Sequence, residues 1–538
     1  MAGLAASFGS GAMTNSIDEL EYTDLILAAG TNTTENHPVI GMKVKRAVKQ
    51  HGTKLIVIDP RGIDLVKYAD IWLCQKPGTD VAVFNGLMNV IIAEGLHAKG
   101  YIAERTEGFD ALKTAVTKYT PEYVEKISGV SAEDLKKAAR LYAKANKASI
   151  IYAMGITQHI SGTDNVKSTA NLAMLCGNIG IEGGGVNPLR GQNNVQGACD
   201  MGGLPDVFPA YQQVANEDAR KKFETAWGAT LSGKHGLTIV EIMNAAGRGD
   251  IKAIYIMGEN PLISDPDLHH IKKELQKLDL LVVQDIFLTE TAEFADVVLP
   301  SASFAEKDGT FTNTERRVQR IRKVVNAPGE AKPDWEIIAG ISTKMGYPMN
   351  YSSAKEIFEE IAKVTPSYAG ISYERIEKEG IQWPCPTPEH QGTKFLHKEK
   401  FSRGLGLFHA IEYIPPAELP DKEYPLILST GRVLYHYHTG TMTRRAVGPS
   451  ERCPESLIEI HPDDAVKFGV NDGQMVKVTS RRGTVEAKAQ ITQKSPQGTI
   501  FMNFHFAEAA VNLLTNPVLD PIGKIPEYKV CAVKLEAA

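Results

Sequence analysis

The sequence has no apolar run of the roughly 20 residues that a membrane helix requires, so it predicts no transmembrane segment. Acidic residues only slightly outnumber basic ones, giving a formal net charge of -5, so nucleic acid is not the expected partner. Only one dense basic cluster is present, formed by Arg316, Arg317, Arg320, Arg322 and Lys323. We interpret it as the solvated face of a helix or strand, which is the usual role of such a cluster.

Several common site signatures are also missing. None of the six cysteines forms a Cys-x-x-Cys pair and no His–Cys group has zinc spacing, so no metal site is complete within the chain. GxGxxG and Walker-type loops are absent, which excludes an ordinary NAD fingerprint and a P-loop. The length of 538 residues, with 43% hydrophobic and 23% charged residues, is typical of a globular protein with several domains.

One pattern of strand and loop occurs twice. In the first copy an apolar run ends at Gly30, a second run ends at Asp59, and an Ala-Asp pair follows. In the second copy these features recur at Gly258, at Asp285 and at another Ala-Asp pair, with nearly the same spacing. Continuous apolar runs separated by helical segments indicate parallel sheets covered on both faces. The sequence therefore predicts an internal duplication of a nucleotide-binding half.

The duplicated residues suit nucleotide binding. Open parallel sheets bind ligands beyond the carboxyl ends of their strands, where glycine lets a phosphate approach the backbone. An acid after the next strand can accept hydrogen bonds from ribose hydroxyls or guanine N–H groups. We therefore expect Asp59 and Asp285 at matching carboxyl ends of two parallel sheets, in a protein that binds two nucleotide ligands or one ligand with two arms.

From about residue 400 onward the sequence changes to short alternating strands. Val476 and Val478 alternate with polar residues, and Val485, Ala487 and Ala489 mark one face of a return strand. The segment SRRGTV between the two runs predicts a tight turn. This alternation indicates a β-rich barrel or sandwich.

A glycine- and amide-rich segment, GVNPLRGQNNVQGACDMGG at residues 185–203, contains a single arginine, Arg190. Amide side chains orient a ligand without adding charge, and glycines let backbone N–H groups approach it closely. The segment therefore predicts a site for a large polar ligand beside a small anion.

Together these features resemble the molybdopterin-guanine-dinucleotide oxidoreductases of the DMSO reductase superfamily, and within them the catalytic subunits of formate dehydrogenases. The similarity extends along essentially the whole chain and includes MGENPL, ADVVLPS, QWPCP, QGTKFLHKEKF and NPVLDPIGKIPEYKVCAV. It implies an α/β fold, with two αβα nucleotide-binding-like domains of mostly parallel sheets and a C-terminal β-barrel. The implied bounds are 1–192 and 193–303 for the αβα domains, 304–391 for a connecting segment, and 392–538 for the barrel.

The resemblance also implies a cofactor and a reaction. The family has molybdenum or tungsten on two molybdopterin guanine dinucleotides, and its formate dehydrogenases oxidise formate to CO2 and pass two electrons to a redox partner subunit or electron carrier. Arg190 matches the arginine that holds formate; the alternative is that it contacts only a cofactor phosphate. Gln192, Asn193 and Asn194 would orient the pterin and the sulfur ligands of the metal; the alternative is a hydrogen-bonded loop without a ligand.

The remaining cofactor contacts are implied by position in the family. Before the barrel they are Gly30, Asn32, Asp59, Arg61, Asp80, Gly155, Thr157, Gly258, Glu259, Gln284, Asp285 and Asp334, the last resembling a guanine-binding acid. In the barrel they are Thr430, Arg432, His436, His438, Asn512 and Lys529. Taken alone, His436 and His438 would more often be core or surface histidines.

In the family, a [4Fe-4S] domain and a metal-binding selenocysteine or cysteine followed by histidine precede the sequence that matches MAGLAASFGSGAMTN here. We therefore expect this chain to be the downstream part of a selenocysteine enzyme, inactive alone, with the metal ligand and cluster before residue 1. The rival is a cysteine-type enzyme whose N-terminal part is lost or separately encoded. A cytoplasmic location is expected.

Two other functions remain open from the sequence. A related enzyme of the superfamily could act on nitrate or another oxyanion, although the segment around Arg190 argues against it. The chain could also be a non-catalytic electron-transfer subunit that has lost the metal. Such a subunit would not be expected to keep Arg190 and both nucleotide-binding halves.

Overall fold

The computed structural model describes all residues from 1 to 538 and divides into two compact units. Unit 1 comprises Met1–Gly191, Pro266–His269 and Phe395–Ala538, and unit 2 comprises Gln192–Asp265 and His270–Lys394. Unit 1 therefore joins the beginning of the chain to its end. No helix of the structure is both long and apolar enough to span a membrane.

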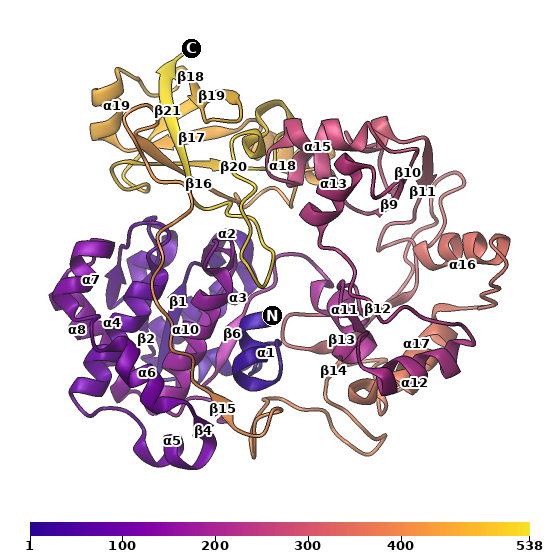
Figure 1. Ribbon diagram of the computed structural model, residues 1–538, viewed down its shortest axis with the longest axis horizontal. Coiled ribbons are helices and arrows are strands. Elements are labelled where there is room, and N and C mark those ends of the chain that lie inside the picture. Colours follow the sequence, from indigo (N-terminus) through magenta and orange to yellow (C-terminus); the bar gives the residue numbers. More distant parts are fainter. The chain divides into compact units, whose positions relative to one another are not determined.

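A five-stranded parallel sheet forms the centre of the first part of unit 1 (Figure 1). The strand order is β3 (Ile71–Leu73), β2 (Lys54–Ile58), β1 (Leu25–Ala29), β5 (Ala148–Tyr152) and β6 (Val186–Pro188). Leu25, Leu27 and Ala29 of β1 pack into one hydrophobic core, whereas Ile26 and Ala28 pack into another. Because successive strand side chains point to opposite faces, both faces are covered, as the apolar runs predict.

Helices complete the two cores of this sheet. The core that contains Leu27 also contains residues of α4 (Asp80–Ala93), α8 (Ala132–Lys144) and α10 (Gly162–Leu175). The opposite core contains Ile40 and Val44 of α3 (Pro38–Arg46). Outer helices α6 (Phe109–Val116) and α7 (Pro121–Ser128) contact α4, so α4 is buried around most of its circumference.

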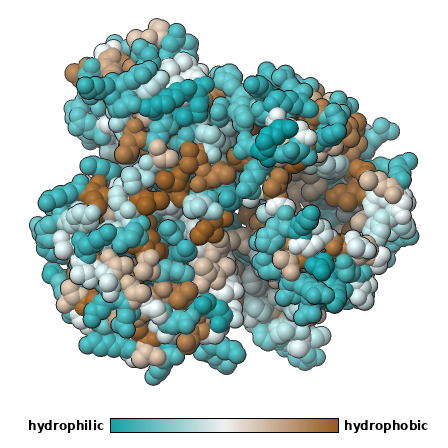
Figure 2. Space-filling model, viewed as in Figure 1, coloured by the Kyte–Doolittle hydropathy of each residue, from teal (hydrophilic) through white to brown (hydrophobic).

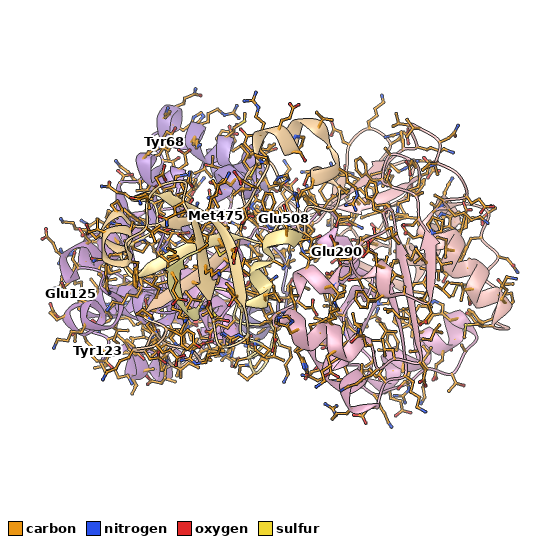
Figure 3. The ribbon with its side chains drawn as sticks, turned by 90° about the horizontal axis from the view of Figure 1, so that it is seen from above. Tyr68, Tyr123, Glu125, Glu290, Met475 and Glu508 are labelled. Carbon is orange, nitrogen blue, oxygen red and sulfur yellow. The ribbon has the colours of Figure 1, made fainter.

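The C-terminal part of unit 1 is a closed barrel, which decides between the barrel and the sandwich. Its order is β16 (Leu426–Gly431), β20 (Thr499–Asn503), β17 (Leu457–Ile460), β19 (Thr484–Ile491), β18 (Met475–Thr479) and β21 (Cys531–Ala537). Val476 and Val478 lie opposite Ala487 and Val485 inside the barrel, as the alternation predicts. The outer surface of the barrel is mainly hydrophilic in Figure 2. Met475, the first residue of β18, is labelled in Figure 3.

Unit 2 contains a smaller parallel sheet in the order β11 (Val297–Pro300), β10 (Leu280–Asp285) and β9 (Ala253–Met257). Ile256, Leu281 and Val283 on one face pack with Met243 of α13 (Ile239–Arg248). Tyr255 and Met257, on the opposite face, are 41% and 50% exposed. Helices of unit 2 therefore bury one face of this sheet more fully than the other.

The rest of unit 2 has a second, antiparallel sheet and three longer helices. The sheet order is β12 (Gly309–Thr312), β13 (Arg317–Ile321) and β14 (Ile381–Gln382). The helices are α12 (Glu217–Trp227), α16 (Asp334–Lys344) and α17 (Ala354–Val364).

The basic cluster on and before β13 differs from the solvated face that its charge density indicates. Arg316 is fully buried, and its guanidinium donates to the carbonyl oxygens of Trp383, Thr393 and Lys394. Arg320 stacks on the Tyr373 ring, with 3.8 Å between the guanidinium carbon and the ring centre. The interpretation as a solvated face is wrong for these residues, because carbonyl groups and rings distant in sequence surround them.

Candidate functional site

The first predicted loop lies at the carboxyl edge of the unit 1 sheet, where two glycines meet. Gly30 follows β1 with a left-handed φ of 53°, and its N–H donates to the carbonyl oxygen of Ile58 at 2.9 Å. Gly155 follows β5 and donates its N–H to the Gly30 carbonyl oxygen at 3.0 Å. A Cβ atom at Gly155 would lie only 2.6 Å from the Gly30 Cα atom, so the two loops touch through their backbones.

Buried polar atoms without hydrogen-bond partners are concentrated in the segment that follows Gly30. They are Thr31 Oγ1, Asn32 Oδ1, Thr33 Oγ1, Glu35 Oε2, Asn36 Oδ1 and His37 Nδ1. A buried polar atom that makes no hydrogen bond costs about 1–3 kcal/mol, so such groups are normally satisfied. This polar segment, residues 31–37, therefore fits a large polar ligand bound at the edge of the sheet. Of its six residues with such atoms, the sequence singled out only Asn32.

The acid after the second strand lies close to residues of the barrel. Asp59 is buried, and burial raises the pKa of its carboxyl to about 6. Lys529 is nearby and half-buried, and removal of its ammonium from water lowers the pKa of this group to about 8. Lys529 Nζ donates to the carbonyl oxygen of Thr430. The structure thus brings together residues that the sequence places in the sheet domain and in the barrel.

Arg61 is another predicted cofactor contact, and it joins the sheet domain to the barrel. Its Nε and Nη2 atoms donate to the two carboxylate oxygens of Glu459, at 2.7 and 2.5 Å. The guanidinium also lies 3.8 Å from the centre of the Phe501 ring. A bidentate, stacked arginine is the strongest form of such a pair, so much of the Arg61 hydrogen-bonding capacity is already used within the protein.

Asp80 and His159 form a buried pair beside Gly155, one of the two glycines that touch. His159 Nε2 donates to the Gly155 carbonyl oxygen at 2.9 Å, and it lies 4.0 Å from Asp80 Oδ2. Burial lowers the pKa of His159 to about 4, so its ring is neutral at pH 7. Burial also raises the pKa of Asp80 to about 7, partly offset by a hydrogen bond from Gln75 Nε2.

The pKa of Asp80 predicts how stability depends on pH. The folded chain favours the protonated carboxyl of Asp80. The stability that this carboxyl contributes to the fold is therefore complete below about pH 4 and is lost as the pH rises through about 7. In the wild type, titration of Asp80 should lower the free energy of unfolding by on the order of 3 kcal/mol between these pH values. Asp80→Asn should abolish this part of the decline. Urea unfolding of the cofactor-free chain at pH 5 and pH 8 measures it. Asp110→Asn, at an exposed helix position, is the matched control and should leave the decline unchanged.

The second copy repeats the hydrogen bonds of the first. The N–H of Gly258 donates to the carbonyl oxygen of Gln284 at 2.9 Å, the same bond that Gly30 makes to the residue before Asp59. The acids of the two Ala-Asp pairs also correspond, because the carboxylate of each accepts from the backbone N–H of the second residue of a strand. Leu55 N donates to Asp70 at 2.9 Å, and Leu281 N donates to Asp296 at 2.7 Å. Asp59 directly follows β2 and Asp285 is the last residue of β10, so both lie at the carboxyl ends of parallel strands, as expected.

The predicted residues of unit 2 cluster at the end of β10. Gln284 donates from Nε2 to Asp334 Oδ1 at 2.7 Å, and Lys307 pairs with the other oxygen of Asp334. The Tyr255 hydroxyl donates to Gln284 Oε1. In the loop after β9, Glu259 accepts from the Ser264 hydroxyl, and Asn260 donates to Glu290, which is labelled in Figure 3. The group combines carboxylate and amide side chains, which are suited to the donor-rich edge of a guanine base.

The backbone around Arg190 is held at several points within unit 1. Leu189 N donates to the Tyr152 carbonyl oxygen at 2.8 Å, and Arg190 Nη2 donates to the Gly11 carbonyl oxygen at 3.1 Å. His37 Nε2 lies 2.7 Å from the Arg190 carbonyl oxygen. Arg432 Nη1 donates to the next carbonyl oxygen, that of Gly191, at 3.2 Å.

The amide residues after Gly191 belong to unit 2, where Gln192 is half-buried and Asn193 exposed. Asn194 has a left-handed φ of 60° and begins α11 (Val195–Asp200); its Oδ1 accepts from Thr312 N at 2.9 Å. This bond ties the start of α11 to strand β12.

Asp200, at the end of α11, is a buried acid that the sequence gave no reason to select. It accepts four hydrogen bonds, from Gln196 at 2.8 Å and from Tyr211, Tyr368 and Trp383 at 2.6 Å each. The Tyr368 hydroxyl also lies 3.0 Å from Thr312 Oγ1. The network therefore joins both ends of α11 to the remainder of unit 2.

The remaining predicted residues of unit 1 make hydrogen bonds with residues of their own domain. The Thr157 hydroxyl donates to Met154 Sδ at 3.4 Å, and the Thr430 hydroxyl donates to the Tyr528 carbonyl oxygen at 2.9 Å. His436 bonds to Thr443 and to the Cys453 carbonyl oxygen, and the His438 carbonyl oxygen pairs with His505. Asn512 accepts from the Thr515 hydroxyl through its carbonyl oxygen. No group of three or more His, Cys, Asp or Glu side chains in the structure could hold a metal ion.

Comparison with known proteins places this arrangement in a family. Residues 4–344 match the molybdopterin oxidoreductase family and residues 426–532 match the molydopterin dinucleotide binding domain. The chain belongs to the molybdopterin oxidoreductase family.

Several of the most similar relatives are named formate dehydrogenases. The F420-dependent formate dehydrogenase subunit alpha of Methanocaldococcus jannaschii is 57% identical, over 99% of this chain and 79% of the relative. Formate dehydrogenase H of Escherichia coli is 43% identical, over 100% of this chain and 76% of the relative. The solved structure of acetylene hydratase from Pelobacter acetylenicus, 22% identical, covers 100% of this chain and 80% of that chain with a TM-score of 0.78, which supports the fold.

Proposed function

We propose that this chain binds molybdenum or tungsten as a bis(molybdopterin guanine dinucleotide) cofactor and serves in the oxidation of formate to CO2. The proposal rests above all on residues 31–36 of the polar segment, where a buried side-chain oxygen of each of five residues makes no hydrogen bond at the edge of a parallel sheet. The repeated glycine hydrogen bond at Gly258 supports a second dinucleotide, and the formate dehydrogenases among the relatives support the substrate.

The side chains present fit such a cofactor. In unit 1 residues 31–36 of the polar segment and Asp59 would meet one dinucleotide, and Lys529 and Arg432 supply positive charge for its phosphates. In unit 2 Gln284 and Asp334 would meet the other, with carboxylate and amide acceptors for guanine. When bound, the metal and its sulfur ligands accept the electrons that formate loses.

Arg190 has the central part in substrate binding. A guanidinium binds both oxygens of a carboxylate through two parallel hydrogen bonds, and formate is the smallest carboxylate. When both oxygens are bound in this way, the C–H bond of formate takes no part in the interaction with the arginine. Formate oxidation breaks that bond and yields CO2, two electrons and a proton.

The electrons pass to a redox partner subunit or an electron carrier. Because the Methanocaldococcus relative is F420-dependent by name, F420 is the first acceptor to test. The six cysteines are all free and none lies in a group that could hold a metal. A [4Fe-4S] cluster would therefore take its ligands from outside these 538 residues.

Metal analysis and a substrate comparison test the proposal. The protein is prepared anaerobically with its natural partner subunits, and formate-dependent reduction of F420 or of a viologen dye is measured beside nitrate reduction. We expect molybdenum or tungsten, two guanine dinucleotides per metal, and activity with formate. Nitrate reduction without formate oxidation would identify an oxyanion reductase, and a protein without metal or pterin would identify a non-catalytic electron-transfer subunit.

A further inference from the structure

His37 makes a hydrogen bond whose direction is fixed by chemistry. Its Nε2 atom lies 2.7 Å from the carbonyl oxygen of Arg190, and a carbonyl oxygen can only accept. Nε2 therefore bears the proton and donates. In the neutral ring Nδ1 is then an acceptor, and this atom is buried without a partner.

The position of the imidazole is set by its own backbone. His37 lies between the short helix α2 (Thr33–Asn36) and Pro38, the first residue of α3. Its N–H donates to the Thr33 carbonyl oxygen at 3.0 Å, and its carbonyl oxygen accepts from Gly41 N at 2.8 Å. Proline also restricts the residue before it to few backbone conformations. The imidazole therefore extends from a fixed point at the sheet edge.

The same stretch of backbone is held from the barrel as well. Arg432 donates to the carbonyl oxygen of Gly191, so two consecutive carbonyl groups each accept from a largely buried side chain. Burial and the nearby Arg432 charge lower the pKa of His37, so its ring is neutral at pH 7. A neutral ring adds no further positive charge beside the guanidinium groups of Arg190 and Arg432.

We propose that His37 is a positioning residue: through its Nε2–H bond to the Arg190 carbonyl group, it fixes Arg190 in the orientation that binds the carboxylate of formate. This role rests on the proposed function, because it assigns Arg190 to the substrate. It is distinct from a contact between His37 and the cofactor, which would have to use the unpartnered Nδ1 atom.

A pair of conservative substitutions separates the two roles of the ring. In His37→Gln the side-chain amide nitrogen reaches the place of Nε2 and can still donate to Arg190. In His37→Asn the amide reaches only the place of Nδ1, so the bond to Arg190 is lost. We expect His37→Asn to lower kcat/KM for formate roughly 10- to 100-fold, since small displacements of a positioning group have effects of this size. We expect His37→Gln to stay within about three-fold of the wild type, as the loss of a modest contact would.

Metal and pterin content distinguish this inference from the proposed function. Both variants should retain the wild-type content per chain. A wild-type enzyme that holds its cofactor but does not oxidise formate refutes the proposed function, whatever the variants do. If His37→Asn instead keeps activity and His37→Gln loses it together with pterin, then Nδ1 contacts the cofactor and the positioning role is wrong.

A second readout does not depend on activity. Trypsin cleaves after arginine, and cleavage of the Arg190–Gly191 bond in the folded protein requires that this loop opens locally. In the cofactor-free protein, mass spectrometry should show cleavage after Arg190 roughly 3- to 10-fold faster in His37→Asn, the change expected for one lost hydrogen bond. Cleavage in His37→Gln should match the wild type, and cleavage after the exposed Arg140 should be equal in all three proteins. Equal cleavage after Arg190 in the wild type and His37→Asn would overturn the proposal.

Discussion

Arg190→Lys should lower kcat/KM for formate by roughly 10- to 150-fold, the equivalent of about 1.5–3 kcal/mol for a lost charge-assisted hydrogen bond. Lysine keeps the positive charge but has no planar fork, so it cannot bind both carboxylate oxygens in parallel. The glycine- and amide-rich surroundings of Arg190 and the bonds that hold its backbone indicate that orientation matters here more than charge. Steady-state kinetics with formate and metal analysis of the same preparation measure the effect.

Arg248→Lys is the matched control for this substitution. Arg248 is an exposed arginine paired with Asp250 at 2.9 Å, and a surface pair of this kind contributes about 0–1 kcal/mol. The control variant should therefore have wild-type kinetics. If Arg190→Lys loses pterin but keeps its activity per metal, Arg190 is a cofactor ligand, and the assignment to formate is wrong.

Asp200→Ala should lower the free energy of unfolding of unit 2 by about 3–5 kcal/mol, one of the largest effects expected for a single residue of this chain. The substitution leaves four donors without their acceptor, from Gln196, Tyr211, Tyr368 and Trp383. Each buried donor left unsatisfied costs about 1–3 kcal/mol, although partial collapse and water entry make the sum less than additive. Urea unfolding followed by tryptophan fluorescence measures the loss, since Trp383 is itself a donor.

Two variants test whether the cost comes from the network. Asp218→Ala removes an exposed acid from the first turn of α12 and should cost less than about 1 kcal/mol. Tyr368→Phe removes one of the four donors and should cost less than Asp200→Ala, because the carboxylate keeps its other three partners. Equal losses in Asp200→Ala and Asp218→Ala would show that the buried network contributes little.

The duplication was predictable because its signals are local. Gly30 and Gly258 each follow an apolar run, and a hydrogen bond from each glycine to the end of the neighbouring strand reproduces the predicted symmetry. The strand pattern of the barrel was predictable for the same reason, since Val476 and Val478 follow a period of two. Periodicity and turn residues are properties of a few neighbouring positions.

Roles that depend on distant partners could not be predicted. Arg61 is matched to the family as a cofactor contact, yet its guanidinium pairs with Glu459 on a barrel strand. Arg316 lies in the most basic segment, yet it is buried because carbonyl groups near Trp383 and Lys394 accept from it. The polar segment 31–37 is an exception, since a run of hydroxyl and amide residues directly after a strand is a local signal of a ligand and was overlooked.

The bond between Arg61 and Glu459 has a consequence for how the protein is made, because 398 positions separate the two residues. A ribosome adds about 5–20 residues per second, so roughly 20–80 seconds pass between the synthesis of one partner and the other. During that time the nascent sheet domain exists without the barrel strands and without Lys529, which lies beside Asp59 in the finished protein. A ligand that contacts both parts can therefore bind only after the barrel strands have been made.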